Sequence, residues 1–287
     1  MQPARFFSPF LLILTAAWLI IYLFIFPDPA GLFLENWPII LLAVAAAIVG
    51  NMTAIGGGII FIPVFMFIYH VNPVSALKLT FVTQAVGMTS GATGWVQRKT
   101  VPLKLLKWTI PSLILGSVVS TFFIHPQTML IKSMFGPVSF FVGMLTLVLA
   151  GRKSSGDDLP PKAMLPVFLV SFIGGLITGW VAIGEGEIIA AFCMLVYGLD
   201  TNKSVGLGVV LLSVNSILLA LVHALYFGGV PWDLAMFTIP GVIWGGRLGP
   251  FLAKRTSATV MKRIFGWIAM LDGLLITLQV VRGHLLR

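Results

Sequence analysis

Two glutamates alternate with two glycines at residues 183–187, Ile-Gly-Glu-Gly-Glu, within a stretch that is otherwise apolar. Carboxylates at membrane depth are rare, costly to bury and usually functional. Glu185 and Glu187 could therefore take up and release protons, and their protonation would relieve the repulsion of an anionic substrate. The structural alternative is that Glu187 caps the N-terminus of a helix, where the helix dipole favours an acidic side chain.

A matching glycine-rich break, Ile55-Gly56-Gly57-Gly58-Ile59-Ile60, lies 128 positions earlier in the chain. We call it the first break, and residues 183–187 the second break. Each glycine weakens a helix by ~1 kcal/mol relative to alanine, so both stretches should interrupt a helix. A helix that restarts at mid-membrane presents unpaired N–H groups and the positive end of its dipole. Because glycine has no Cβ, an oxyanion can approach these donors, and we expect the two breaks to form one anion-binding site. The alternative is that the glycines only allow close helix packing.

Further polar residues are expected to line this site, because hydroxyl and amide groups suit tetrahedral oxyanions. Together with Gly56, Gly57, Gly58, Gly184 and Gly186 they are Thr53, Thr80, Thr83, Gln84, Ser213, Asn215 and Ser216. Hydrogen bonds between helices would explain each of these polar residues equally well. Arg247 is the clearest base inside an apolar segment. It could bind a sulfonate through two hydrogen bonds, pair with Glu185, Glu187 or Asp272, or extend to the membrane surface.

The composition predicts an all-α polytopic membrane protein. Of 287 residues, 58% are hydrophobic and 9% are charged, whereas soluble domains carry about 25% charged residues. The long apolar runs suit spanning helices and not the short alternating strands of a barrel. The net charge of +9 does not indicate nucleic-acid binding, because the bases lie in short connections between apolar segments. Membrane lipid is the expected surrounding.

Eleven apolar segments should form the helices. They are 6–26, 37–54, 59–69, 76–96, 107–124, 134–150, 164–182, 187–197, 204–227, 233–251 and 264–281. Segments 59–69 and 187–197 are too short to span a bilayer, and each directly follows a glycine break. This arrangement predicts two re-entrant hairpins. The first segment has no small-residue cleavage site, which indicates a retained helix and not a signal peptide.

Charge in the connections predicts the orientation. The basic stretches 98–107, 152–162 and 254–263 should be cytoplasmic, while 27–36 and 228–232 lack bases and should be external. If two hairpins are re-entrant, the number of membrane crossings places the N-terminus on the cytoplasmic side and the C-terminus on the external side of the cell's inner membrane. Arg282 and Arg287, near that C-terminus, conflict mildly with this orientation. Lys78 and Lys203 occupy nearly matching positions in the two halves and could steer anions at the two mouths.

The chain also contains an internal repeat. When Ile55 is aligned with Ile183, Tyr69 meets Tyr197; with one insertion, Pro102 meets Pro231, Pro111 meets Pro240 and Gly116 meets Gly245. The predicted orientation makes the halves run in opposite directions, which is the inverted repeat of secondary transporters. The expected units are an extra N-terminal helix with an external loop (1–36), a first repeat (37–151), a cytoplasmic linker (152–163) and a second, inverted repeat (164–287).

The motifs and their order resemble a known family. The first half reads GNMTAIGGGIIFIPVFMF, NPVSALKLTFVTQ, GATGWVQRKTVPLK and IPSLILGS; the second reads TGWVAIGEGEIIAAFCML, DTNKSVGLGVV, HALYFGGVPW and IPGVIWGGRLGPFLAKR. Over residues 37–281 this pattern resembles the TauE/SafE family of sulfite and organosulfur-anion exporters. The resemblance implies export of sulfite or an organosulfonate by alternating access. The chain departs from the family at Glu185 and Glu187, where a second glycine triplet is common.

Enzyme and metal motifs are absent from the sequence. It has no GxxxxGK[ST], HExxH or GxSxG pattern, and its four histidines and one cysteine have no metal-like spacing. We therefore expect a transporter without a cofactor or bound metal, coupled to protons through Glu185 or Glu187. Two alternatives stay open. One is a passive anion channel, and the other is a cation transporter that uses both glutamates as ligands.

Overall fold

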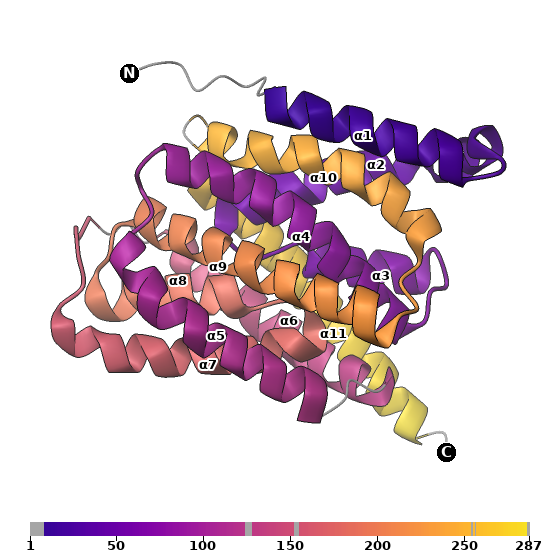
Figure 1. Cartoon of the computed structure of the whole chain (residues 1–287). Helices are drawn as coiled ribbons and strands as arrows, with labels where there is room; N and C mark the ends of the chain where they lie inside the picture. Colours follow the sequence, from indigo (N-terminus) through magenta and orange to yellow (C-terminus); the bar gives the residue numbers. More distant parts are fainter. Residues whose placement is uncertain (1–8, 124–127, 152–154, 254, 256, 286–287) are drawn as a thin grey trace.

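The computed structural model describes residues 9–123, 128–151, 155–253, 255 and 257–285. These residues form eleven α-helices and, as their only extended pairing, an isolated bridge between Gly156 and Leu199 (Figure 1). The helices are α1 (Pro9–Ile25), α2 (Pro29–Thr53), α3 (Gly58–Phe67), α4 (Pro73–Gln97), α5 (Leu103–Phe123), α6 (Thr128–Ala150), α7 (Met164–Val181), α8 (Glu185–Tyr197), α9 (Thr201–Leu221), α10 (Trp232–Ala253) and α11 (Ala258–Leu285). A 3₁₀ turn, η1 (Pro161–Ala163), precedes α7, and a π-helical turn, η2 (Val222–Phe227), continues α9.

Each predicted apolar segment corresponds to one helix, and the largest difference lies at the start of α2. This helix begins at Pro29, whereas residues 27–36 were expected to form an external loop. Asp28 caps the helix, because its carboxylate accepts a hydrogen bond of 2.9 Å from the Gly31 N–H. Proline at the first helical position stabilises the same start. Only a short turn therefore separates α1 from α2.

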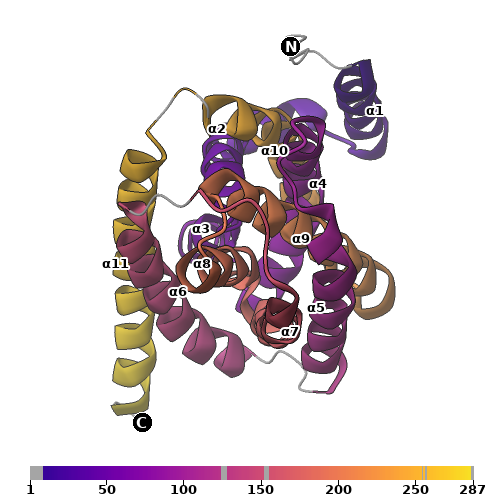
Figure 2. The same ribbon diagram turned by 90° about the vertical axis from the view of Figure 1, so that its left-hand side faces the viewer.

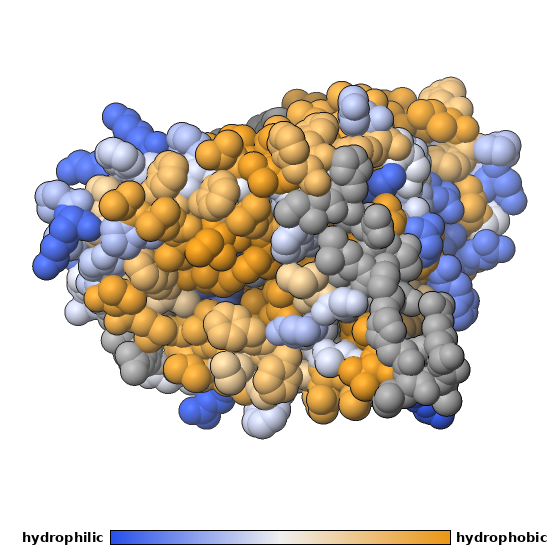
Figure 3. All heavy atoms as spheres, turned by 90° about the horizontal axis from the view of Figure 1, so that it is seen from below, coloured by the Kyte–Doolittle hydropathy of each residue, from blue (hydrophilic) through white to orange (hydrophobic). Residues whose placement is uncertain are grey.

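The helices form an all-α polytopic membrane protein. Helix α2, helix α5, the range Ser133–Ala150, the range Pro161–Val181 and the range Thr201–Phe227 are long and apolar enough to cross a membrane. In Figure 3 hydrophobic side chains cover the middle of the visible face, and hydrophilic side chains gather towards both ends. Helices α4 and α10 are less apolar, because many of their residues face other helices and not lipid.

Helices from the two halves of the chain pack against each other. Helix α4 crosses α9 in the centre, while α2 packs on α10, α5 on α7, and α6 on α11 (Figure 2). Two glycine contacts occupy equivalent positions in the two halves. A Cβ at Gly116 of α5 would lie 2.2 Å from the Phe172 carbonyl oxygen, and one at Gly245 of α10 would lie 2.4 Å from that of Val44. Both glycines are therefore needed for close helix approach, as small residues are in membranes.

The connections gather at two ends of the molecule. Figure 1 shows the links from α4 to α5, from α6 to α7 and from α10 to α11 at one end, which we call the basic end. The links from α1 to α2, from α3 to α4 and from η2 to α10 lie at the other end, which we call the far end. Helix α2 starts at the far end and α7 at the basic end, and α3 and α8 each return towards the end where the preceding helix began.

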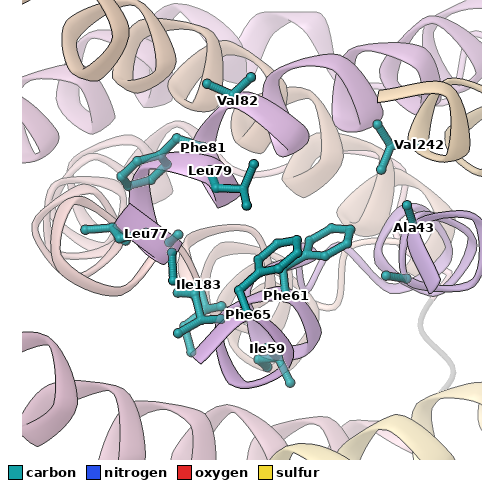
Figure 4. Close-up of a cluster of buried hydrophobic side chains, with 14 of the residues drawn as sticks. Ala43, Ile59, Phe61, Phe65, Leu77, Leu79, Phe81, Val82, Ile183 and Val242 are labelled. Carbon is teal, nitrogen blue, oxygen red and sulfur yellow. The ribbon is translucent and has the colours of Figure 1, made fainter. Parts of the chain in front are cut away.

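Apolar packing surrounds the first break. Figure 4 shows Ile59, Phe61 and Phe65 of α3 beside Leu77 of α4 and Ile183 of the second break. All five side chains are buried, and the rings of Phe61 and Phe65 stack with centroids 5.8 Å apart. Inside a membrane such packing stabilises a fold through van der Waals contact and not through exclusion of water. The cluster therefore fixes α3 against the second half of the chain.

At the basic end the linker between α6 and α7 lies against the turn between α8 and α9. The Gly156 N–H donates to the Gly198 carbonyl at 2.9 Å, and the Asp200 N–H donates to the Gly156 carbonyl at 2.8 Å. Lys203 forms an ion pair of 2.8 Å with Asp157. The hydrogen bond that Lys203 Nζ donates to Oδ1 of Asp157, together with the lysine charge, holds the pKa of the Asp157 carboxyl below its usual value. Lys203 therefore bonds the carboxylate and the carbonyl of Asp157. Residues 152–154 of the predicted linker lie outside the described chain.

Candidate functional site

The two breaks have matching backbone geometry. Helix α2 is followed by the cap residue Ala54, whose φ is 62°, and α7 is followed by the cap residue Ala182, whose φ is 55°. Each alanine N–H donates back into its own helix, at 2.9 Å for Ala54 and 2.8 Å for Ala182. Two residues later, Gly56 and Gly184 have φ values of 85° and 102°. Glycine tolerates this left-handed region, whereas other residues adopt it at a cost of roughly 1–2 kcal/mol.

The breaks also pack reciprocally on each other. A Cβ at Gly58, the first residue of α3, would lie 2.5 Å from the Ala182 carbonyl oxygen. A Cβ at Gly186, in the first turn of α8, would lie 2.3 Å from the Ala54 carbonyl oxygen. Any side chain at either position would overlap a backbone carbonyl. The start of each short helix therefore touches the end of the long helix from the other half.

Gln84 of α4 joins the first half of the chain to the second break. Its Nε2 donates to the Ala182 carbonyl at 2.9 Å, and its Oε1 accepts a hydrogen bond of 3.1 Å from the Ser216 hydroxyl. The side chain is 1% exposed, and a Cβ at Gly56 would lie 3.2 Å from Nε2. One amide therefore contacts both breaks and α9. A role for Gln84 in substrate binding stays a prediction.

The sequence predicted that Glu185 lies in the break, but in the structure it is the first residue of α8. Its side chain is fully buried, and its Oε2 accepts a hydrogen bond of 2.5 Å from Nδ2 of Asn215. The Thr178 hydroxyl also lies beside the carboxyl, although it donates to the Ile183 carbonyl at 3.3 Å. Among the described residues, the Oε1 atom of Glu185 and the Oδ1 atom of Asn215 have no hydrogen-bond partner. The surroundings of Glu185 are therefore polar but neutral.

Glu187 faces different neighbours, because residues two apart on a helix point in different directions. Its Oε1 accepts a hydrogen bond of 3.1 Å from the Thr146 hydroxyl of α6. Lys262 of α11 interacts electrostatically with this carboxyl, and its side chain is only 3% exposed. The sequence placed Lys262 in a cytoplasmic loop, whereas the structure buries it in the first turns of a helix. Glu187 therefore has a cation in its surroundings and Glu185 does not.

The predicted hydroxyl groups are buried and bonded to protein. Thr53 and Thr80 donate to carbonyls one turn earlier in their own helices, at 2.9 and 2.8 Å. Thr83 pairs with Thr238 of α10 at 2.7 Å, and Ser213 pairs with Thr89 of α4 at 2.8 Å. In this conformation the hydroxyls of Thr83 and Ser213 connect helices around the crossing of α4 and α9.

Arg247 lies towards the basic end and not beside the breaks. Its Nη2 donates to Oε1 of Gln97 at 2.8 Å, and its Nη1 donates to the Thr93 hydroxyl at 3.4 Å. Thr93 is nine residues after Gln84, which corresponds to about 14 Å along α4. The side chain of Asp272, the other considered partner, lies outside the described part. A role for Arg247 in substrate binding stays a prediction.

Asn51 is a buried polar residue near the first break that was not among the predicted site residues. Its Nδ2 donates to the Ala47 and Gly87 carbonyls at 2.9 and 3.2 Å, while its Oδ1 has no partner among the residues described. The side chain is fully buried. The presence of an amide side chain inside the predicted apolar segment 37–54 could have indicated Asn51 as a site residue.

Comparison with known proteins decides the family. The model of the sulfite exporter TauE/SafE family matches residues 39–276, a range that contains both breaks and every predicted site residue. The chain belongs to the TauE/SafE family. This membership and the helices of spanning length make it a multi-pass membrane transporter. Helix α1 precedes the range that the TauE/SafE model matches.

Relatives of this TauE/SafE protein carry similar descriptions. It is 26% identical to the "Probable membrane transporter protein YjnA" of Bacillus subtilis, over 79% of this chain and 95% of the relative. It is 21% identical to "Probable membrane transporter protein YunE" of the same organism, over 82% and 94%. A "Probable membrane transporter protein" of Xylella fastidiosa is 27% identical, over 75% and 84%. No solved structure matches the chain.

Proposed function

We propose that this TauE/SafE protein is a secondary transporter that exports a small sulfur-containing oxyanion, sulfite or an organosulfonate, across the inner membrane. The main support for this proposal is the reciprocal packing of the two breaks. Gly58 lies against Ala182 and Gly186 lies against Ala54, so the N-termini of α3 and α8 meet in one region. Two helix N-termini bring unpaired N–H donors and two positive dipole ends to an anion.

The proposed architecture is an inverted repeat, with residues 37–151 and 164–287 as its two units and α1 as an extra helix. Support comes from the corresponding contacts of Gly116 and Gly245 and from the opposite ends at which α2 and α7 begin. In this proposal the segments α2–α3 and α7–α8 are re-entrant hairpins. The basic end faces the cytoplasm, which places the N-terminus inside and the C-terminus outside. Movement of one repeat against the other would expose the site to each side in turn.

Substrate binding would take place mainly at the first break. The start of α3 carries Gly56, Gly57 and Gly58 and no carboxylate, whereas the first turn of α8 carries two glutamates. Gln84 already directs its Nε2 to this region, where it donates to the Ala182 carbonyl. An anion that takes this donor would release the end of α7. Binding at one half would thereby loosen the contact with the other, which is what alternating access requires.

Proton coupling is proposed at the glutamates, with Glu185 as the better candidate. A charged carboxylate beside the site repels an anion, and proton uptake removes that repulsion. Glu187 has Lys262 as a counter-charge, whereas the hydrogen-bonding neighbours of Glu185 are neutral amide and hydroxyl groups. Protonation of Glu185 would therefore change the net charge next to the substrate most directly.

A thermal-shift panel on the purified protein tests the substrate class. Sulfite, sulfate, thiosulfate, sulfoacetate and taurine would be compared with carboxylate analogues at two pH values. We expect stabilisation by sulfur oxyanions in wild type and a smaller shift in Gln84→Leu. Stabilisation by divalent cations alone would support the cation-transporter alternative. The different neighbours of Glu185 and Glu187 argue against that alternative, because the two carboxyls do not converge on one ligand position.

A further inference from the structure

A buried histidine lies near the far end of the molecule, on the π-helical turn that continues α9. His223 is 1% exposed, and neither its Nδ1 nor its Nε2 has a hydrogen-bond partner among the described residues. Its ring stacks on Phe81 of α4, with centroids 5.2 Å apart and planes 9° from parallel, and contacts Phe227 at 5.2 Å. A polar ring that is buried without a partner is unfavourable, and π-helical turns occur frequently at functional sites.

Lys78 lies one turn before Phe81 on α4 and directs its charge to the same region. Its Nζ donates to the Gly228 carbonyl at 2.7 Å, and the ammonium interacts electrostatically with His223. Gly229, whose φ is 71°, lies next to the ammonium, because a Cβ there would be 3.4 Å from Nζ. An ammonium has three N–H donors, and Gly228 accepts only one of them. The start of α4 and the turn after η2 therefore place a cation and an imidazole together.

Lys78 and its counterpart at the basic end, Lys203, differ in their charged neighbours. Lys203, at the nearly matching position of the second half, is neutralised by Asp157 at 2.8 Å. The ion pairs found in the described chain, Lys203–Asp157 and Lys104–Asp158, both lie at the basic end. At the far end Asp28, Glu35 and Asp233 are exposed. The pair of Lys78 and His223 therefore has positive charge and buried polar atoms without a contacting carboxylate.

We propose that Lys78 and His223 form a second binding position for a small oxyanion, at the far end and separate from the breaks. The ammonium supplies charge and donors, and a neutral imidazole supplies one N–H donor and one acceptor nitrogen. An oxyanion that retains one proton, such as hydrogen sulfite, matches that pair of imidazole atoms. The rings of Phe81 and Phe227 limit water access, which strengthens such hydrogen bonds.

Two helices connect this position to the proposed transport site. Lys78 precedes Gln84 by six residues on α4, and His223 follows Ser216 by seven residues on α9 and its π-helical continuation. Both separations correspond to about 10 Å along a helix. The contact between Gln84 and Ser216 at 3.1 Å marks the point where the helices cross. The inference rests on the proposed function, and in it the anion occupies the Lys78–His223 position when it enters or leaves at the far end.

The test compares sulfite transport from the two faces of the membrane. Labelled sulfite exchange would be measured in right-side-out and inside-out vesicles that contain wild type, His223→Phe or Lys78→Gln. His223→Phe keeps an aromatic ring between Phe81 and Phe227 and removes both nitrogens. We expect KM at the far-end face to rise about tenfold or more, as for loss of a charge-assisted hydrogen bond, with KM at the basic-end face unchanged. Lys78→Arg, which keeps the charge, should restore most of the affinity.

Three variants serve as matched controls. His70→Asn removes an exposed histidine at the same end, Lys203→Gln removes the paired lysine, and Tyr226→Phe changes η2 without altering His223. The melting temperature of His223→Phe should equal or exceed that of wild type, because an unpartnered polar group is removed. Wild-type KM at both faces in His223→Phe and Lys78→Gln would overturn the inference. Absence of sulfite exchange in wild type would instead overturn the proposed function.

Discussion

Nε2 of Gln84 lies 2.9 Å from the carbonyl oxygen of Ala182, so a side chain of the first half closes the end of a helix in the second. Ser216 holds the other end of the same amide at 3.1 Å. Both bonds would be lost in Gln84→Leu, which leaves the Ala182 carbonyl and the Ser216 hydroxyl buried without this partner. We expect a loss of about 1–3 kcal/mol in stability and at least a tenfold loss of transport. Thermal melting and vesicle flux measure the two effects.

Gln97→Leu is the control for this change, because Gln97 lies on the same helix and bonds Arg247 at the basic end. Gln97→Leu should lower the melting temperature, and its transport should still depend on substrate binding at the breaks. Transport by Gln84→Leu at the wild-type rate would show that the amide is structural only.

The reciprocal glycine contacts predict two matching variants. Gly58→Ala and Gly186→Ala would each place a Cβ within 2.5 Å of a carbonyl oxygen of the other break. Overpacking of this kind costs typically 1–3 kcal/mol, and we expect both variants to lower the melting temperature by similar amounts. Gly151→Ala is the control, because no atom lies within 4 Å of a Cβ there. If only one of the two variants is destabilised, the breaks do not support each other as described.

The two glutamates should respond differently to neutralisation. Glu187→Gln removes a carboxylate that interacts electrostatically with buried Lys262, and a buried cation that loses a nearby opposite charge destabilises the fold. Glu185→Gln keeps an oxygen that can accept the Asn215 hydrogen bond, so its stability should stay close to that of wild type. The double variant Glu187→Gln with Lys262→Met should recover much of the loss. Equal melting temperatures for the two single variants would contradict the assignment of Lys262 to Glu187.

The linker at the basic end should show a dependence on pH. Lys203 holds the pKa of Asp157 below its ordinary value of about 3.9. A carboxyl with a depressed folded-state pKa contributes its stabilisation above the unfolded pKa and loses it as pH falls through the folded pKa. In Asp157→Asn we therefore expect faster hydrogen exchange at Gly156 and Asp200 than in wild type above pH 4, with the difference disappearing in stronger acid. Identical exchange at pH 7 would show that the ion pair does not hold the linker.

Much of the helical layout could be predicted from the sequence, because apolar run lengths and glycine breaks are local signals. The break positions at Gly56 and Gly184 follow from the same local chemistry. The start of α2 lies within the predicted loop 27–36, although Asp28 followed by Pro29 forms a recognisable helix start. The hydrogen bond from Gln84 to Ala182 joins residues 98 positions apart. No local pattern specifies such a contact.

The burial of Lys262 shows the same limit. The sequence places Lys262 beside Arg263 in a basic stretch, which ordinarily indicates a loop at the membrane surface. Its position near Glu187 depends on how α11 packs against the rest of the bundle, and side-chain patterns along one segment do not contain that information. The different surroundings of Glu185 and Glu187 likewise follow only from the packing of α6, α9 and α11.

Efflux from vesicles tests the central proposal most directly. Purified protein would be reconstituted in proteoliposomes loaded with labelled sulfite, and efflux would be followed at several internal concentrations with and without an imposed pH gradient. The proposal predicts efflux that saturates with sulfite and responds to the gradient, with the response lost in Glu185→Gln. Efflux that rises linearly with concentration and ignores the gradient in wild type would contradict a coupled transporter and indicate a passive channel.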